Sequence, residues 1–185
     1  MSVARPVIRP STRLRLRRLR AGLGAACAAV AWMGAVHAQM QASEAEVKAA
    51  FIYNFALFTT WPASTLPANA PMVLCVAPEH PLQAALGRLA GKPVRGHRLE
   101  VHRLGDGAGC HMVVLDDRAR AQVARPDPAA PVLTVVDGGR VGASGSMIAL
   151  SLQDSRVVFD IDAAAARQAG LQLSSQLLRL ARSVQ

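Results

Sequence analysis

Aromatic residues are scarce in this sequence, and only three cysteines are present. Aromatics make up 4% of the 185 residues, whereas hydrophobic residues make up 51%. The apolar share excludes a disordered or collagen-like chain. With so few aromatics, Ala, Leu and Val must build most of the core. The length fits about one domain.

Acidic residues are absent from the first 38 residues, which hold seven arginines. The formal net charge of +9 would by itself suggest a nucleic-acid-binding protein. The remainder, residues 39–185, holds 14 basic and 12 acidic residues, and its basic residues are scattered singly. The basic character therefore belongs to the N-terminal segment, and we predict no nucleic-acid partner.

Residues 1–38 have the pattern of a secretory signal peptide. An Arg-rich stretch precedes the uncharged run Ala21–Val36, and small side chains lie just before a predicted cleavage site after Ala38. An uncleaved anchor is the alternative, but the run has 16 residues, fewer than the ~20 that span a bilayer. Residues 39–185 contain no second long apolar run. We predict a signal peptide over 1–38 and a soluble periplasmic domain over 39–185.

The hydrophobic pattern of residues 39–185 predicts a single α/β domain. Its elements suggest a mixed, mostly parallel sheet of about six strands with helices on both faces. The predicted strands cover 72–77, 99–104, 111–115, 131–136, 147–152 and 156–161. The strand order around 99–115 stays open, because the link between two of these strands has about six residues and a parallel crossover needs a dozen or more.

The first predicted helix, Ser43 to Thr59, is apolar on two sides. One stripe carries three phenylalanines and is predicted to face the core: Val47, Ala50, Phe51, Phe55 and Phe58. The other side is predicted to be exposed and to contact another protein: Ala49, Ile52, Tyr53 and Ala56.

The sequence contains no recognisable catalytic or metal-binding constellation. The Gly105–Gly109 turn lacks the spacing of a phosphate-binding loop, and the histidines stand at no ligand spacing. Asp160 and Asp162 share a face, but Asp162 is better explained as a helix cap. We therefore predict a protein that is not an enzyme and has no cofactor or metal.

Signal-peptide removal leaves two cysteines, Cys75 and Cys110. Export to an oxidising compartment favours a disulfide between them. Two buried free thiols are the alternative.

The stretch KAAFIYNFALFTTWP at residues 48–62 resembles the YfiR family of small periplasmic proteins. Further matching stretches follow in order and cover nearly all of residues 39–185: VLCVA at 73–77, GKPVRGHRLEV at 91–101, GCHMVVL at 109–115, GSMIALSLQDSRVVFDID at 145–162 and AGLQLSSQLLRLAR at 169–182.

The resemblance implies an exported, non-enzymatic α/β domain that restrains a partner in the inner membrane. The resemblance implies that this partner is a diguanylate cyclase, whose product cyclic di-GMP governs biofilm formation. A sensor kinase is the alternative partner in the membrane. A second copy of the chain, in a homodimer, is a further possible partner. Cys75 and Cys110 fall on one family cysteine pair. A second family pair would lie near Gly142 and Ala149 and is absent here.

The alternative function is a periplasmic small-ligand binding protein that serves a sensor kinase or a transporter. Such a protein needs a cleft with convergent polar groups.

Overall fold

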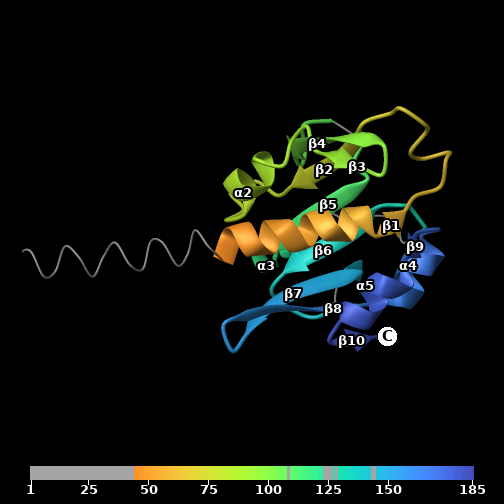
Figure 1. Cartoon of the computed structure of the whole chain (residues 1–185). Helices are drawn as coiled ribbons and strands as arrows, with labels where there is room; N and C mark the ends of the chain where they lie inside the picture. The colour runs from red at the N-terminus through yellow and green to blue at the C-terminus, as the bar shows by residue number, and fades with distance from the viewer. Residues whose placement is uncertain (1–43, 108, 123–126, 128, 143–144) are drawn as a thin grey trace, which may run out of the picture. The chain divides into compact units, whose positions relative to one another are not determined.

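The computed structural model describes residues 44–107, 109–122, 127, 129–142 and 145–185 (Figure 1). The predicted signal peptide and Ser43, the predicted start of the first helix, lie outside these residues. The described residues form an α/β fold around one large sheet.

Eight strands of the described part form this sheet, in the order β10-β8-β7-β6-β5-β2-β4-β3. Five neighbouring strands run parallel: β2 (Met72–Val76), β4 (His97–Arg103), β5 (Met112–Asp116), β6 (Leu133–Asp137) and β7 (Ile148–Gln153). β8 (Arg156–Ile161) is antiparallel to β7, and β10 (Ser183–Val184) is parallel to β8. β3 (Pro93–Val94) is antiparallel to β4, and β1 (Thr59–Thr60) pairs separately with β9 (Gln172–Leu173).

The predicted mostly parallel sheet is confirmed, and all six predicted strands are present. The predicted number of strands is too low, because β3 and β10 extend the sheet at its two edges. Each of these strands has two residues, which is too short for an alternating pattern in the sequence.

The strand order left open by the sequence is resolved by a short parallel crossover. β2 lies between β4 and β5, so residues 104–111 pass over β2. The Leu104 N–H donates to the Val76 carbonyl at 2.8 Å, and the His111 N–H donates to the Val73 carbonyl at 2.9 Å. The link needs no helix because it runs back along only a short stretch of β2.

The link and helix α2 (Gln83–Gly87) lie on opposite faces of the sheet. Ala85 and Leu86 of α2 share a buried cluster with Leu74, whereas Leu104 and Cys110 pack against the cluster that contains Val73. The direction of strand addition reverses after β4. A constant crossover hand therefore requires the connection to change faces.

Helices cover both faces of the sheet, as predicted. The larger core lies beneath the first helix (residues 44–57), α2, α4 (Ala163–Gln168) and α5 (Ser175–Leu180). Figure 1 shows the first helix in orange lying across the sheet. On the other face, Ala119 of α3 (Asp117–Gln122) packs against β2 and β5.

Polar side chains cap the last two helices, and the cap at Asp162 is the one predicted above. The Asp162 carboxylate accepts a hydrogen bond from the Ala165 N–H at 2.8 Å and begins α4. The Ser174 hydroxyl accepts one from the Leu177 N–H at 3.2 Å and begins α5. These contacts satisfy backbone donors that the first helical turn leaves without partners.

The prediction that one side of the first helix is exposed is wrong. Ile52 and Ala56 are 0% exposed and Ala49 is 2% exposed. Tyr53 is half-buried, and its hydroxyl donates to the Pro93 carbonyl at 2.6 Å. On the side predicted to be core, Phe55 is buried, but Val47 is 43% exposed.

The prediction is wrong because the side of the helix with the small residues packs against the sheet, where it allows the closest approach. Ala49, Ile52 and Ala56 stand at i, i+3 and i+7, so they form one stripe on the helix. The two small alanines allow the backbone to approach the sheet closely, with Ile52 between them. Phe51 lies at the edge of this contact, where its ring stands 5.9 Å from that of Phe159.

Candidate functional site

The two cysteines fasten the crossover to the strand beneath it. Cys75 of β2 and Cys110 of the link form the predicted disulfide, with a Cα–Cα distance of 5.8 Å. Cys75 is 1% exposed and belongs to the smaller core. The bond therefore ties the sheet interior to a connection whose described residues form no helix.

His111, next to this disulfide, is a structural residue. Its Nδ1 accepts a hydrogen bond from the Val73 N–H at 3.0 Å, and its Nε2 lies 3.1 Å from the Thr65 carbonyl. Its own carbonyl accepts from the Trp61 indole N–H at 3.0 Å. Both ring nitrogens are thus engaged by backbone. Among the described residues, no group of three or more His, Cys, Asp or Glu is placed to hold a metal.

Asp160 and Asp162 have separate structural partners. Arg182 forms an ion pair with Asp160 and also donates to the Gln153 side chain at 3.1 Å. Asp162 caps α4. Asp160 therefore serves an ion pair and Asp162 a helix cap, so the two carboxylates are not arranged as an acid–base pair.

A charged cluster missed by the sequence analysis lies at the carboxyl ends of the parallel strands. Lys48 of the first helix places its Nζ 2.8 Å from the Asp137 Oδ1 at the end of β6 and 2.8 Å from the Glu44 Oε1. The Lys48 and Asp137 side chains are 12% and 13% exposed. Burial lowers the pKa of Lys48, but the hydrogen bonds that its ammonium donates to Asp137 and Glu44, together with the negative charges of these two carboxylates, outweigh burial and leave that pKa raised.

His80 lies buried in the same region. It is 3% exposed, and its Nδ1 accepts a hydrogen bond from the Leu82 N–H at 3.0 Å. Its Nε2 is buried with no hydrogen-bond partner among the residues described. The direction in which strands are added to the sheet reverses between β2 and β5. Open parallel sheets have a crevice at the carboxyl ends of the strands at such a point.

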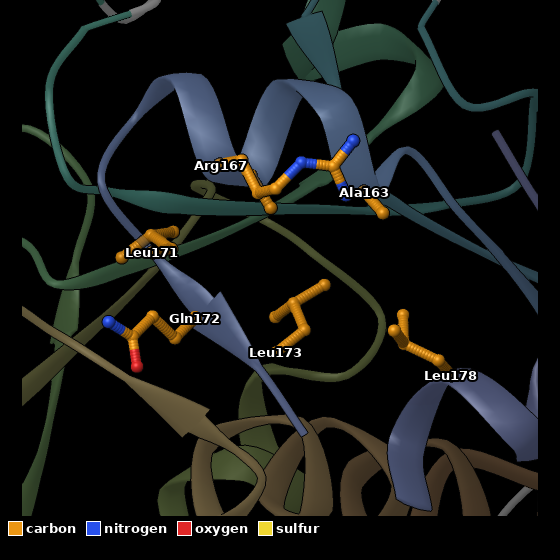
Figure 2. Close-up of a pocket in the computed structure, with 7 residues that line it drawn as sticks. Ala163, Arg167, Leu171, Gln172, Leu173 and Leu178 are labelled. Atoms are coloured by element: carbon orange, nitrogen blue, oxygen red, sulfur yellow. The ribbon is translucent and has the colours of Figure 1, made fainter. Parts of the chain in front are cut away.

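An apolar pocket of about 230 Å³ lies between α4, β9 and α5. Figure 2 shows Arg167 on α4 above the pocket, with Leu173 of β9 and Leu178 of α5 on its other sides. The other lining residues are Ala163, Ala166, Leu171 and Gln172. Arg167 and Gln172 supply the polar side chains, and both are exposed.

Four large hydrophobic side chains of the described part are exposed. Leu180 is 65% exposed at the end of α5 and Val184 is 46% exposed in the edge strand β10. We call these two residues the C-terminal apolar patch. Val47 of the first helix and Leu152 of β7 are 43% and 49% exposed.

Comparison with protein families identifies a match over most of the chain. The model of a family described as YfiR/HmsC-like matches residues 45–182. No curated protein matches the chain. Within the described ranges, no helix has both the length and the apolar character needed to cross a membrane.

Proposed function

Because the chain belongs to the YfiR/HmsC-like family, we propose that it is a periplasmic regulatory protein that restrains a diguanylate cyclase of the inner membrane. The family match over residues 45–182 carries this proposal. In this role the protein acts by binding and catalyses no reaction. Its effect on the cell is a lower level of cyclic di-GMP and less biofilm.

Export supports the same proposal. The signal-peptide pattern of residues 1–38 directs the domain across the inner membrane. The periplasm is oxidising, so the disulfide between Cys75 and Cys110 is stable there. The domain then lies on the side of the membrane where a cyclase sensor part is exposed.

The surface proposed for the partner is the C-terminal apolar patch. The side chains first assigned to the contact, Ala49, Ile52 and Ala56, are buried and cannot reach a partner without unfolding the helix from the sheet. Leu180 and Val184 project from the end of α5 and from an outer strand. Contiguous exposed apolar surface marks protein contact sites, and we take these two side chains as the centre of such a surface.

We expect Leu180→Asp to weaken binding to the periplasmic part of the cyclase by about thirtyfold, because it places a charge in an apolar contact worth roughly 2 kcal/mol. The Kd of purified protein for that cyclase segment measures the effect. Val47→Asp is the matched control, since Val47 is also exposed but lies on the first helix. Equal Kd values for the wild type and Leu180→Asp would exclude this surface.

The pocket beside α4 supports a second candidate function, the binding of a small ligand that is signalled to a sensor kinase. Its apolar lining and the Arg167 guanidinium suit a small apolar carboxylate. We expect such a compound to raise the melting temperature of the wild type, and Arg167→Met to abolish that rise. Arg156→Met, at an exposed position outside this pocket, is the control. A screen of small carboxylates without any thermal shift would count against this function.

A further inference from the structure

We propose that the edge of the sheet formed by β3 and β4 binds the anionic phospholipid surface of the inner membrane through exposed basic side chains. We call Lys92, Arg95 and Arg98 the basic edge. Binding to such a surface is a property of the domain alone. Its biological meaning, holding the domain at the membrane beside its partner, rests on the proposed periplasmic function.

Positive charge is concentrated in one segment of the domain. Residues 88–103 hold one acidic residue, Glu100, and five basic residues: Arg88, Lys92, Arg95, Arg98 and Arg103. The rest of residues 39–185 holds nine basic and 11 acidic residues. The positive excess of residues 39–185 therefore comes from this segment, although its basic residues stand singly in the sequence.

The β3–β4 hairpin presents this charge at the end of the sheet, on the side of the first helix away from β7 and β8 (Figure 1). The two-residue turn Arg95–Gly96 joins the strands, with φ values of 50° and 90°, as in a tight hairpin turn. Lys92, Arg95 and Arg98 are exposed. The Arg98 guanidinium lies beside Gly91, where an added Cβ would stand 3.6 Å from Nη2.

Contacts with the first helix hold two of these cations side by side. The Lys92 Nζ lies 5.7 Å from the centre of the Tyr53 ring, and the Arg95 side chain donates to the Leu57 carbonyl at 3.4 Å. Tyr53 and Leu57 stand at i and i+4, so they lie on one side of the helix, about 6 Å apart along its axis. The Tyr53 hydroxyl also donates to the carbonyl of Pro93, which fixes the ring beneath Lys92.

The acidic groups near this edge have partners of their own. Arg88 pairs with Glu46 at 3.0 Å, and Glu100 lies 3.1 Å from the His102 Nε2. Lys92, Arg95 and Arg98 form no ion pair with any residue that the structure describes. Their charges are therefore free to attract an anionic surface.

An extended anionic surface fits this arrangement better than a small anion. A small anion needs charged groups that converge on one point, whereas Lys92 and Arg95 are anchored one helical turn apart along an edge. A membrane offers phosphate groups at many positions and attracts exposed Lys and Arg side chains close to it. Because β3 and β10 are the two outer strands of the sheet, membrane contact at β3 leaves the C-terminal apolar patch open to the cyclase.

Vesicle co-sedimentation of the exported protein, purified from the periplasm, tests the basic edge without the cyclase. We expect binding to vesicles with about one third phosphatidylglycerol, loss of this binding in about 0.5 M salt, and no binding to vesicles of phosphatidylcholine alone. Lys92→Gln combined with Arg95→Gln should weaken the binding about 25-fold, because each lost charge lowers the affinity about fivefold.

Arg156→Gln combined with Arg179→Gln is the matched control. It removes the same net charge from exposed positions on β8 and α5, and it should leave the affinity for vesicles within about twofold of the wild type. Lys92→Arg combined with Arg95→Lys keeps both charges and should keep the binding. If the first glutamine pair does not fold, Arg98→Gln alone replaces it, with an expected loss of about fivefold.

Three results would overturn the proposal. The first is a wild-type protein that does not bind the anionic vesicles. The second is an equal loss of binding in the control pair, which would mean that only the total charge matters. The third is binding to heparin without binding to vesicles, which would assign the edge to a soluble polyanion. None of these measurements involves the cyclase, so the membrane contact and the proposed function fail or stand separately.

Discussion

Ile52→Asp is expected to unfold the domain. Ile52 is 0% exposed beneath the first helix, so an aspartate there would bury an unpaired charge in the larger core. Substitutions of this kind lower the free energy of unfolding by more than about 4 kcal/mol. This is a large fraction of the roughly 5–15 kcal/mol that stabilises a typical domain. Circular dichroism and thermal unfolding should show no cooperative transition near that of the wild type.

Val47→Asp is the matched control on the same helix. Val47 is 43% exposed, and a substitution at such a surface position changes stability by about 0.5 kcal/mol or less. The contrast between these variants tests which side of the helix faces the sheet. A folded Ile52→Asp protein, with a melting temperature close to that of the wild type, would show that the assigned helix face is wrong.

Cys110→Ser is expected to lower the melting temperature by roughly 10 °C under oxidising conditions. The disulfide joins residues 35 positions apart, and closing a loop of that length is worth about 4 kcal/mol in the chain-entropy model. Cys110 is the better position to change because it is half-buried, whereas a serine at Cys75 would also bury a hydroxyl. Differential scanning calorimetry measures the change.

Reduction provides the control for the disulfide. Dithiothreitol should lower the wild-type melting temperature to that of Cys110→Ser and leave the variant unchanged. The same wild-type midpoint with and without the reductant would mean that the bond contributes no stability.

The elements that the sequence predicts correctly are those with a local signal. The apolar runs of β2, β5 and β6 end at turns or charges, and the β7–β8 hairpin is marked by residues 153–155 between two alternating runs. Asp162 and Ser174 precede their helices as caps. These patterns do not depend on which strands become neighbours.

The features that the sequence does not predict depend on tertiary contacts. A helix that is apolar all round has no distinct hydrophobic face in its sequence that shows which side packs on the sheet. Ile52 is buried because the small alanines beside it let the helix backbone approach the sheet closely. The crossing of residues 104–111 over β2 depends on the place of β2 between β4 and β5.

The cluster of His80, Lys48 and Asp137 arises in the same way. These residues come from three separate segments, and the sheet order brings them to one edge. One signal was present in the sequence: Asp116 and Asp137 each end an apolar strand. The carboxyl ends of parallel strands meet at one edge of the sheet, so both residues were candidates for a common site.

Cellular cyclic di-GMP tests the regulatory role most directly. It would be measured in cells lacking the gene and in the same cells supplied with either the full chain or residues 39–185 without the export segment. Restraint from the periplasm predicts that deletion raises cyclic di-GMP, that the full chain restores the lower level and that the form without residues 1–38 does not. Unchanged cyclic di-GMP after deletion, or full restoration by the unexported form, would contradict it.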